Sequence, residues 1–206
     1  VNGTVTIDWG DNTTDTLTGT SLTTAKNVQH LYQTGGDYVI KLTPTSGSFS
    51  IFGVSSNGTH LLKKEASLSA NTSRVYSNAV QKVELGSNVT IGTYAFYYCC
   101  SLASITIPNS VTNFGTYAFY YCYSLTSITV PSDVTSIGSS VFYNCYSLAS
   151  IAIPSGVTSF GTNEFRNCYS LASITIPSGM ISIGNYAFYS CSALASTTVP
   201  SSVTSL

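Results

Sequence analysis

The octapeptide SLASITIP, residues 101–108, recurs along the second half of the chain with almost no change. The later copies are SLTSITVP at 124–131, SLASIAIP at 147–154, SLASITIP at 170–177 and ALASTTVP at 193–200. Each copy begins 23 residues after the previous one. A fixed period of about 20–50 residues is typical of proteins in which similar units stack into a solenoid. This repeat therefore decides the fold.

Three side chains keep the same period over residues 93–206 and define columns. The cysteine column is Cys99, Cys122, Cys145, Cys168 and Cys191. The phenylalanine column is Phe96, Phe119, Phe142, Phe165 and Phe188. The proline column is Pro108, Pro131, Pro154, Pro177 and Pro200. One unit cannot bury its own apolar face, so the columns predict a continuous core shared by stacked units.

Each unit is expected to contain a short strand and a tight turn. Ile105 and Ile107 alternate with Thr106, which is the period of a β-strand. Pro108 ends the strand because it has no backbone N–H. The segment YAFYYC at 117–122 predicts a tight turn or a single helical turn, with its Phe and Cys pointing inward. Stacked units would place parallel strands about 4.8 Å apart.

The unit resembles the BspA-type leucine-rich repeat, which reads roughly I-G-x-x-A-F-x-x-C-x-x-L-x-x-I-x-I-P-x-x-V. The matching residues are Ile137, Gly138, Phe142, Cys145, Leu148, Ile151, Ile153, Pro154 and Val157. The resemblance implies a solenoid over residues 74–206, with an atypical first unit near 75–98 and 23-residue units after it. It also implies a bacterial surface or secreted protein with a role in adhesion.

The N-terminal part has a different pattern. VTIDWGDNTTDTL predicts a strand, a turn and a return strand, because alternating apolar residues flank a Gly-Asp-Asn turn. The segments Trp9-Gly10-Asp11, His30-Leu31-Tyr32 and 36–42 (GDYVIKL) resemble the motifs of PKD-type, immunoglobulin-like domains. The resemblance implies a small PKD-like β-sandwich at residues 1–73, either a reduced version or one whose first strands are cut away. The predicted fold class is thus mainly β, with this domain preceding the solenoid.

Charge is scarce in this chain. Charged residues make up 7% of the 206 residues and the formal net charge is −1, whereas about 25% charged is usual. A chain with no basic patch is not expected to bind nucleic acid. No apolar stretch reaches the length of about 18 residues of a membrane span, so no membrane insertion is expected within the chain. The chain starts at Val1 and stops inside a unit at Leu206, as expected of a piece of a longer protein.

The sequence contains no catalytic motif, and neither an enzyme activity nor a cofactor is predicted. The column cysteines are expected to be small buried core residues rather than disulfides or zinc ligands, while Cys100 is expected to be more accessible. Asp8, Asp11 and Asp15 lie on one predicted hairpin and form a weak candidate for Ca²⁺. The alternative is that they cap the turn through their side-chain oxygens.

Tyrosine is the most distinctive residue type, with 15 in the chain. Many of them repeat at the 23-residue period, and the short turn cannot turn all of them inward, so we expect exposed aromatic stripes. Tyrosine is enriched at interfaces because it combines an apolar ring with a polar tip. The predicted ligand-binding residues are Tyr120, Tyr123, Tyr143, Tyr146 and Tyr169. The alternative is that the stripes only shield the flank of the solenoid.

The outward face of the strands is a second candidate surface. Thr106 and Thr129 are its representatives, and the face is flat, small and hydroxylated. The predicted function is a secreted or cell-surface bacterial protein that recognises a host or matrix protein through the solenoid, in an extracellular location. One alternative is a carbohydrate-binding module of a larger glycan-processing protein. The other is a structural spacer without a ligand.

Overall fold

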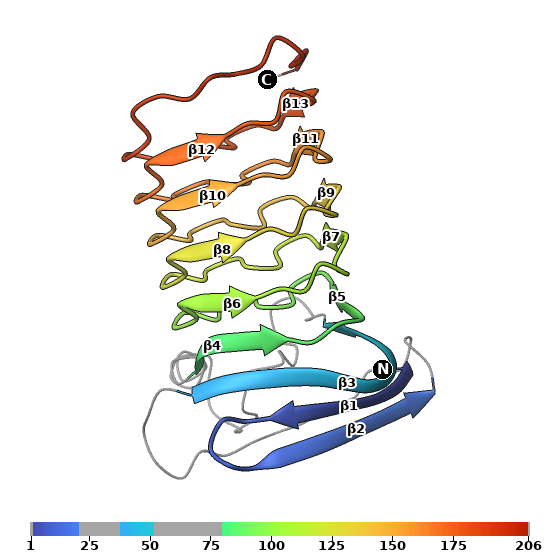
Figure 1. The fold of residues 1–206 in the computed structure, drawn as a ribbon. Helices are drawn as coiled ribbons and strands as arrows, with labels where there is room; N and C mark the ends of the chain where they lie inside the picture. The colour runs from blue at the N-terminus through green and yellow to red at the C-terminus, as the bar shows by residue number, and fades with distance from the viewer. Residues whose placement is uncertain (1, 21–37, 52–79, 206) are drawn as a thin grey trace.

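The computed structural model describes residues 2–20, 38–51 and 80–205, which form thirteen β-strands and contain no helix. The repeat region rises as a stack of coils, and the polypeptide passes through two columns of parallel strands in each turn (Figure 1). The first column is β4 (Val80–Leu85), β6 (Ser104–Thr106), β8 (Ser127–Thr129), β10 (Ser150–Ala152) and β12 (Ser173–Thr175). The second is β5 (Val89–Ile91), β7 (Asn113–Phe114), β9 (Ser136–Ile137), β11 (Ser159–Phe160) and β13 (Ser182–Ile183).

The register of the strands confirms the 23-residue solenoid. Ile151 lies opposite Ile128 on one side and Ile174 on the other, in parallel ladders. In the atypical first unit, Val83 of β4 lies opposite Ile105 of β6. The isoleucines point inward and the Ser and Thr residues beside them point outward, which is the alternation expected of a strand with one buried face.

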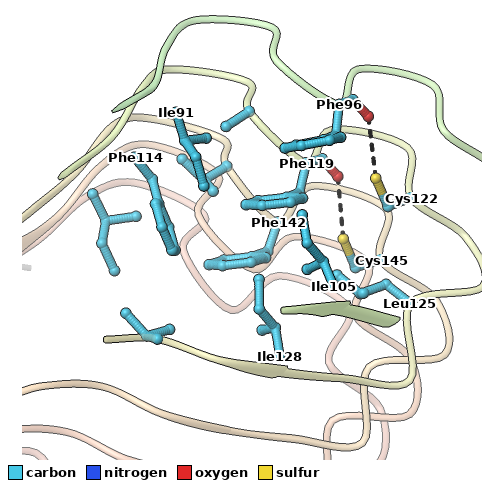
Figure 2. Packing of buried hydrophobic residues seen from close by; sticks show 14 of the residues in the cluster. Ile91, Phe96, Ile105, Phe114, Phe119, Cys122, Leu125, Ile128, Phe142 and Cys145 are labelled. Atoms are coloured by element: carbon cyan, nitrogen blue, oxygen red, sulfur yellow. Dashed lines mark hydrogen bonds between the residues drawn. The ribbon is translucent and has the colours of Figure 1, made fainter. Parts of the chain in front are cut away.

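A stack of phenylalanine rings runs through the core (Figure 2). Successive rings of the phenylalanine column lie nearly parallel, with centroids 5.2 Å apart for Phe96 and Phe119 and 5.7 Å apart for Phe119 and Phe142. Phe114 of β7 packs against this stack edge-on, 5.6 Å from Phe119. The predicted inward orientation of Phe119 and Cys122 is confirmed, since both are fully buried.

The YAFYYC segments form short turns, and the structure contains no single-turn helix in the units. Tyr94 and Tyr98 have φ angles of +58° and +60°, and the equivalent residues of later units do the same. Left-handed residues four apart break the right-handed helical path. The backbone N–H groups of the turn instead point alternately to the next unit and to their own unit. The N–H of Phe96 donates to the carbonyl of Ala118 in the next unit, whereas the N–H of Tyr97 donates to the carbonyl of Tyr94 in the same unit.

The coils approach each other most closely at the glycine that precedes this turn. A Cβ atom on Gly115 would lie 2.3 Å from the carbonyl carbon of Gly92 and 2.3 Å from the nitrogen of Thr93. Real Cβ atoms do not approach backbone atoms to that distance, so only glycine allows this spacing. The packing of coil on coil explains the glycine that follows each second-column strand in the sequence.

The N-terminal strands continue the solenoid. β1 (Asn2–Asp8) and β2 (Thr14–Thr20) form the predicted hairpin, and β1 also pairs antiparallel with β3 (Tyr38–Ile51). The first half of β3 pairs in parallel with β4 and its second half with β5, so one long strand extends both columns. The three strands thereby cover the N-terminal end of the stack (Figure 1).

The proposed PKD-like sandwich and its boundary near residue 73 stay predictions. The motif residues His30, Leu31 and Tyr32 and the boundary itself lie outside the described residues. Within the described part, Trp9 is buried beside the hairpin turn, and Gly10 and Asn12 adopt positive φ as the turn requires.

Candidate functional site

Ten tyrosines on the turn segments form one continuous aromatic surface, which we call the tyrosine face. Its members are Tyr94, Tyr97, Tyr98, Tyr117, Tyr120, Tyr121, Tyr123, Tyr143, Tyr146 and Tyr169. Its five predicted members, Tyr120, Tyr123, Tyr143, Tyr146 and Tyr169, are brought together by the fold. That they bind a ligand stays a prediction.

Rings of the same column stack across neighbouring coils. Tyr123 and Tyr146 have centroids 4.7 Å apart at an interplanar angle of 19°, and Tyr146 and Tyr169 lie 5.0 Å apart at 28°. In a second column Tyr120 and Tyr143 lie 4.6 Å apart at 16°. These spacings follow from the strand separation of about 4.8 Å, because every column inherits the rise of the coils.

Edge-to-face contacts join the columns into a sheet of rings. Tyr121 meets Tyr120 at 4.4 Å, Tyr123 at 5.4 Å and Tyr143 at 5.9 Å, each nearly perpendicular. Burial raises the pKa of the Tyr97 phenol, and neighbouring phenols raise it further. The Tyr97 phenol therefore stays neutral at physiological pH and can both donate and accept hydrogen bonds. Because stacking covers the faces of interior rings, the surface presents mainly ring edges and hydroxyl groups.

Part of the tyrosine face is built on strained backbone. Tyr94, Tyr98, Tyr117 and Tyr121 all have φ between +58° and +63°, a conformation that costs a non-glycine residue roughly 1–2 kcal/mol. Three of the four equivalent positions in the next two units hold asparagine, which tolerates this conformation better, namely Asn144, Asn163 and Asn167, and the fourth holds Ser140. Sequence reasoning placed the site further along the solenoid and missed these four residues. The substitution of Asn and Ser at the same repeat positions was the signal that could have found them.

Arg166 interrupts the column formed by Tyr97, Tyr120, Tyr143 and Tyr189. Its guanidinium carbon lies 5.7 Å from the ring centroid of Tyr143 and 4.8 Å from that of Tyr189. A third ring, that of Tyr186, lies 5.5 Å away. Tyr186 and Tyr189 are among the most exposed aromatic residues, at 60% and 52%. The cation therefore sits at the C-terminal border of the tyrosine face.

The competing strand surface is exposed but shallow. Thr106 of β6 and Thr129 of β8 both point to solvent, as predicted, and lie on strands rather than on the turns that carry the tyrosines. Ser127, beside Thr129, is also exposed. Small side chains bury little area in a contact, so this face offers fewer anchoring groups than the tyrosine face.

The aspartates of the N-terminal hairpin are occupied by hydrogen bonds of the hairpin itself. Asp8 accepts from the N–H of Gly10 at 2.9 Å, and Asp15 accepts from the indole N–H of Trp9 at 2.8 Å. Asp11 accepts from the N–H of Thr13 at 3.2 Å. Among the described residues no cluster of His, Cys, Asp and Glu could hold a metal ion. The geometry is that of turn capping and of support for Trp9.

The column cysteines are hydrogen-bond donors as well as core residues. The thiol of Cys122 donates to the carbonyl of Phe96 at 3.2 Å, and that of Cys145 donates to Phe119 at 3.3 Å (Figure 2). Cys168 and Cys191 repeat this contact with Phe142 and Phe165. Burial raises the pKa of these thiols, that of Cys191 to about 11. The predicted burial is confirmed, and Cys100 is more exposed than the column members.

Glu164 is a buried polar residue that sequence reasoning did not single out. It occupies the position that Ala95, Ala118, Val141 and Ala187 hold in the other units. The residue has no exposed surface, and neither carboxyl oxygen has a hydrogen-bond partner. Burial raises the pKa of this carboxyl well above its usual range; the backbone N–H groups of Val141 and Gly161 lie nearby without the geometry of a hydrogen bond and offset only part of this effect.

Residues 89–206 match the family described as the BspA type leucine rich repeat region, in six copies. Among solved structures, a T. pallidum leucine-rich repeat protein is 27% identical over 82% of this chain and 77% of its own, with a TM-score of 0.60. A leucine-rich cell surface protein from Faecalibacterium prausnitzii A2-165 is 28% identical over 81% of this chain, with a TM-score of 0.53. This chain covers 46% of the length of that protein.

A leucine-rich repeat protein from Bacteroides ovatus ATCC 8483 is 27% identical over 63% of this chain and 34% of its own, with a TM-score of 0.50. No curated protein matches the chain significantly. The described residues also contain no helix that is long and apolar enough to cross a membrane.

Proposed function

The chain belongs to the BspA-type leucine-rich repeat family, and from this premise we propose that it is a secreted or cell-surface protein that binds another protein through its tyrosine face. The repeat scaffold supports a binding role because solenoids use their extended surfaces for recognition. The F. prausnitzii neighbour is named a cell surface protein, which supports the location. Neither the motifs nor the buried polar groups suggest catalysis, so the proposed role is adhesion or binding rather than an enzymatic one.

The observation that carries the proposal is the strained and partly exposed block of tyrosines. Strained backbone persists where the surrounding structure enforces it, and it clusters at functional sites. Tyrosine is among the residues that dominate binding energy when an interface forms. A surface of ring edges and hydroxyls can make both apolar contacts and hydrogen bonds with a protein partner.

The carbohydrate alternative has one observation in its favour. Sugar rings stack on the open face of an aromatic ring, and interior rings of the tyrosine face have neighbours on their faces. Tyr169 is the end ring of its stack, with Tyr146 on one side only, and is 45% exposed. A glycan would therefore bind at this end, not along the whole surface. The spacer alternative predicts no binding at all.

The proposal is tested by screening the purified chain against immobilised extracellular-matrix proteins and against a glycan array. For any protein bound, replacement of Tyr146 and Tyr169 by Ala should weaken binding at least tenfold, about 1.4 kcal/mol. Replacement of Thr106 and Thr129 by Val should leave it nearly unchanged. The opposite result would move the site to the strand surface, and binding to glycans alone would favour the carbohydrate alternative.

A second variant separates binding from shielding. Tyr98→Asn with Tyr121→Asn places at two strained positions the residue that Asn144 and Asn167 supply in later units. The variant should keep its melting temperature, because Asn tolerates positive φ, yet lose affinity. If affinity is kept while the melting temperature falls, the rings serve stability and not recognition.

A further inference from the structure

We propose that Arg166 is a specificity-determining residue that receives a single carboxylate, an Asp or Glu side chain, from the protein bound on the tyrosine face. The inference rests on the proposed function and adds the chemistry of the partner. Arg166 takes the place of a tyrosine within the aromatic column, so the guanidinium lies within the same surface as the rings beside it. The other four units hold tyrosine at this position, namely Tyr97, Tyr120, Tyr143 and Tyr189.

The guanidinium is held in place by aromatic rings and one amide, not by an acid. Tyr143, Tyr186 and Tyr189 surround it, and Arg166 Nη1 donates to Asn163 Oδ1 at 3.3 Å. Cation–π contacts fix the orientation of an arginine but leave its in-plane N–H groups for hydrogen bonds. A group that is oriented in advance loses less entropy when a ligand binds.

No carboxylate of the described residues pairs with this cation. The ion pairs of that part of the chain join Glu84 to Lys41 and Lys82, at the N-terminal end of the solenoid. Glu164, two residues away in sequence, is fully buried and forms no ion pair. Arg166 Nε is buried and has no acceptor. Because Nε has no exposed surface, a carboxylate from a partner can approach the guanidinium only through its Nη groups, where a bidentate pair uses the N–H groups of both nitrogens.

Charge complementarity determines the kind of partner. Arg166 is the only Lys or Arg in the sequence from 83 to 206. Nucleic acids and anionic membranes need several cations, because their binding grows with the number of charges neutralised. One cation within a neutral aromatic surface suits one carboxylate with apolar neighbours.

The test uses a phage-displayed library of random peptides, selected on the purified chain and on Arg166→Gln, Arg166→Tyr and Asp133→Asn variants. Arg166→Tyr completes the tyrosine column and should fold, and Asp133→Asn is a control that changes net charge at an exposed residue far along the sequence. Peptides selected on the wild type and on Asp133→Asn should share an Asp or Glu at one position next to apolar residues. Those selected on either Arg166 variant should not.

One selected peptide is then compared with its amide counterpart, Asp→Asn or Glu→Gln. We expect at least a tenfold loss of affinity on the wild type and less than a twofold change on Arg166→Gln, measured by calorimetry. Equal losses on both proteins would overturn the role of Arg166. The selected peptides could also lack a preferred Asp or Glu and yet fail to bind the variant Tyr98→Asn with Tyr121→Asn. That result would overturn this inference and leave the proposed function intact. If no peptide binds the wild type or any variant, both this inference and the proposed function are overturned. The same holds if the chain binds acidic glycans but no peptide.

Discussion

Replacement of Glu164 by Gln should change how stability depends on pH. The Glu164 side chain is fully buried without a hydrogen-bond partner, and burial raises its pKa. In the unfolded chain the same carboxyl titrates near pH 4.3. Below that pH the carboxyl is protonated in both the folded and the unfolded state, so its ionisation does not change the free energy of unfolding. As pH rises, the unfolded state loses its proton while the folded state keeps it, so stability falls until the pH reaches the raised pKa of the folded state.

The size of this effect follows from linkage. Each pH unit in that window costs about 1.4 kcal/mol for one proton. For a chain of this size, about 1 kcal/mol shifts the melting temperature by roughly 2–4 °C. The wild type should therefore lose about 3–6 °C per pH unit relative to Glu164→Gln from about pH 5 upward, until the pH reaches the raised pKa of the folded state.

The assay is thermal unfolding followed by circular dichroism from pH 4 to pH 8 for both proteins. Gln has nearly the same shape and cannot ionise, so the difference between the two curves isolates Glu164 from every other titrating group. Parallel curves would show that the carboxyl is ionised or solvated in the native state, and would refute the reasoning. A difference that grows in the opposite direction with pH would mean that an unrecognised cation stabilises the charged form.

Three further outcomes are expected. Gly115→Ala should lower the melting temperature markedly because its Cβ would meet the backbone of the preceding coil, whereas Gly179→Ala, with one atom at 3.7 Å, should be tolerated; equal effects would contradict the close approach. Phe142→Ala should cost about 3–5 kcal/mol in denaturant unfolding, and a shift within error would argue against the ring stack. A thiol reagent applied without denaturant should modify Cys100 alone or nothing, and rapid modification of Cys145 would contradict its burial.

The solenoid could be predicted because every unit repeats the same local information. Ile105, Pro108 and Phe119 each predict one feature of a unit, and the 23-residue period places that feature beside its copies. Contacts between units therefore join equivalent positions of neighbouring units, even though these positions are 23 residues apart in the chain. The inward phenylalanines and cysteines, the parallel register and the exposure of Thr129 all follow from this pattern.

Other features depend on information that the pattern does not contain. β3 pairs with both β4 and β5, a contact between residues 38–51 and 80–91 that no repeat specifies. The choice between a helical turn and the observed turn depends on the backbone at Tyr94 and Tyr98, and tyrosine has no preference for positive φ that would reveal it. The thiol hydrogen bonds were hidden because a buried cysteine also fits a purely apolar core.

The energetics of the tyrosine face set backbone strain against ring contacts. The pair Tyr98 and Tyr121 gains one tilted ring contact, with centroids 4.3 Å apart at an interplanar angle of 38°, and ring contacts are worth about 0.5–1.5 kcal/mol. Both residues pay for positive φ, at roughly 1–2 kcal/mol each. Four edge-to-face contacts, with Tyr97, Tyr120, Tyr123 and Tyr143, bring the gain from ring contacts to about the same size as the strain. Asn at the same two positions would remove most of the strain and keep the turn, as Asn144 and Asn167 show, but would lose these ring contacts. Asn144 and Asn167 also hydrogen-bond to each other across the coils at 2.7 Å. Tyrosine and asparagine are thus both compatible with this turn, so the stability of the turn does not by itself explain the tyrosines, and the affinity of the variant Tyr98→Asn with Tyr121→Asn tests the proposed recognition role.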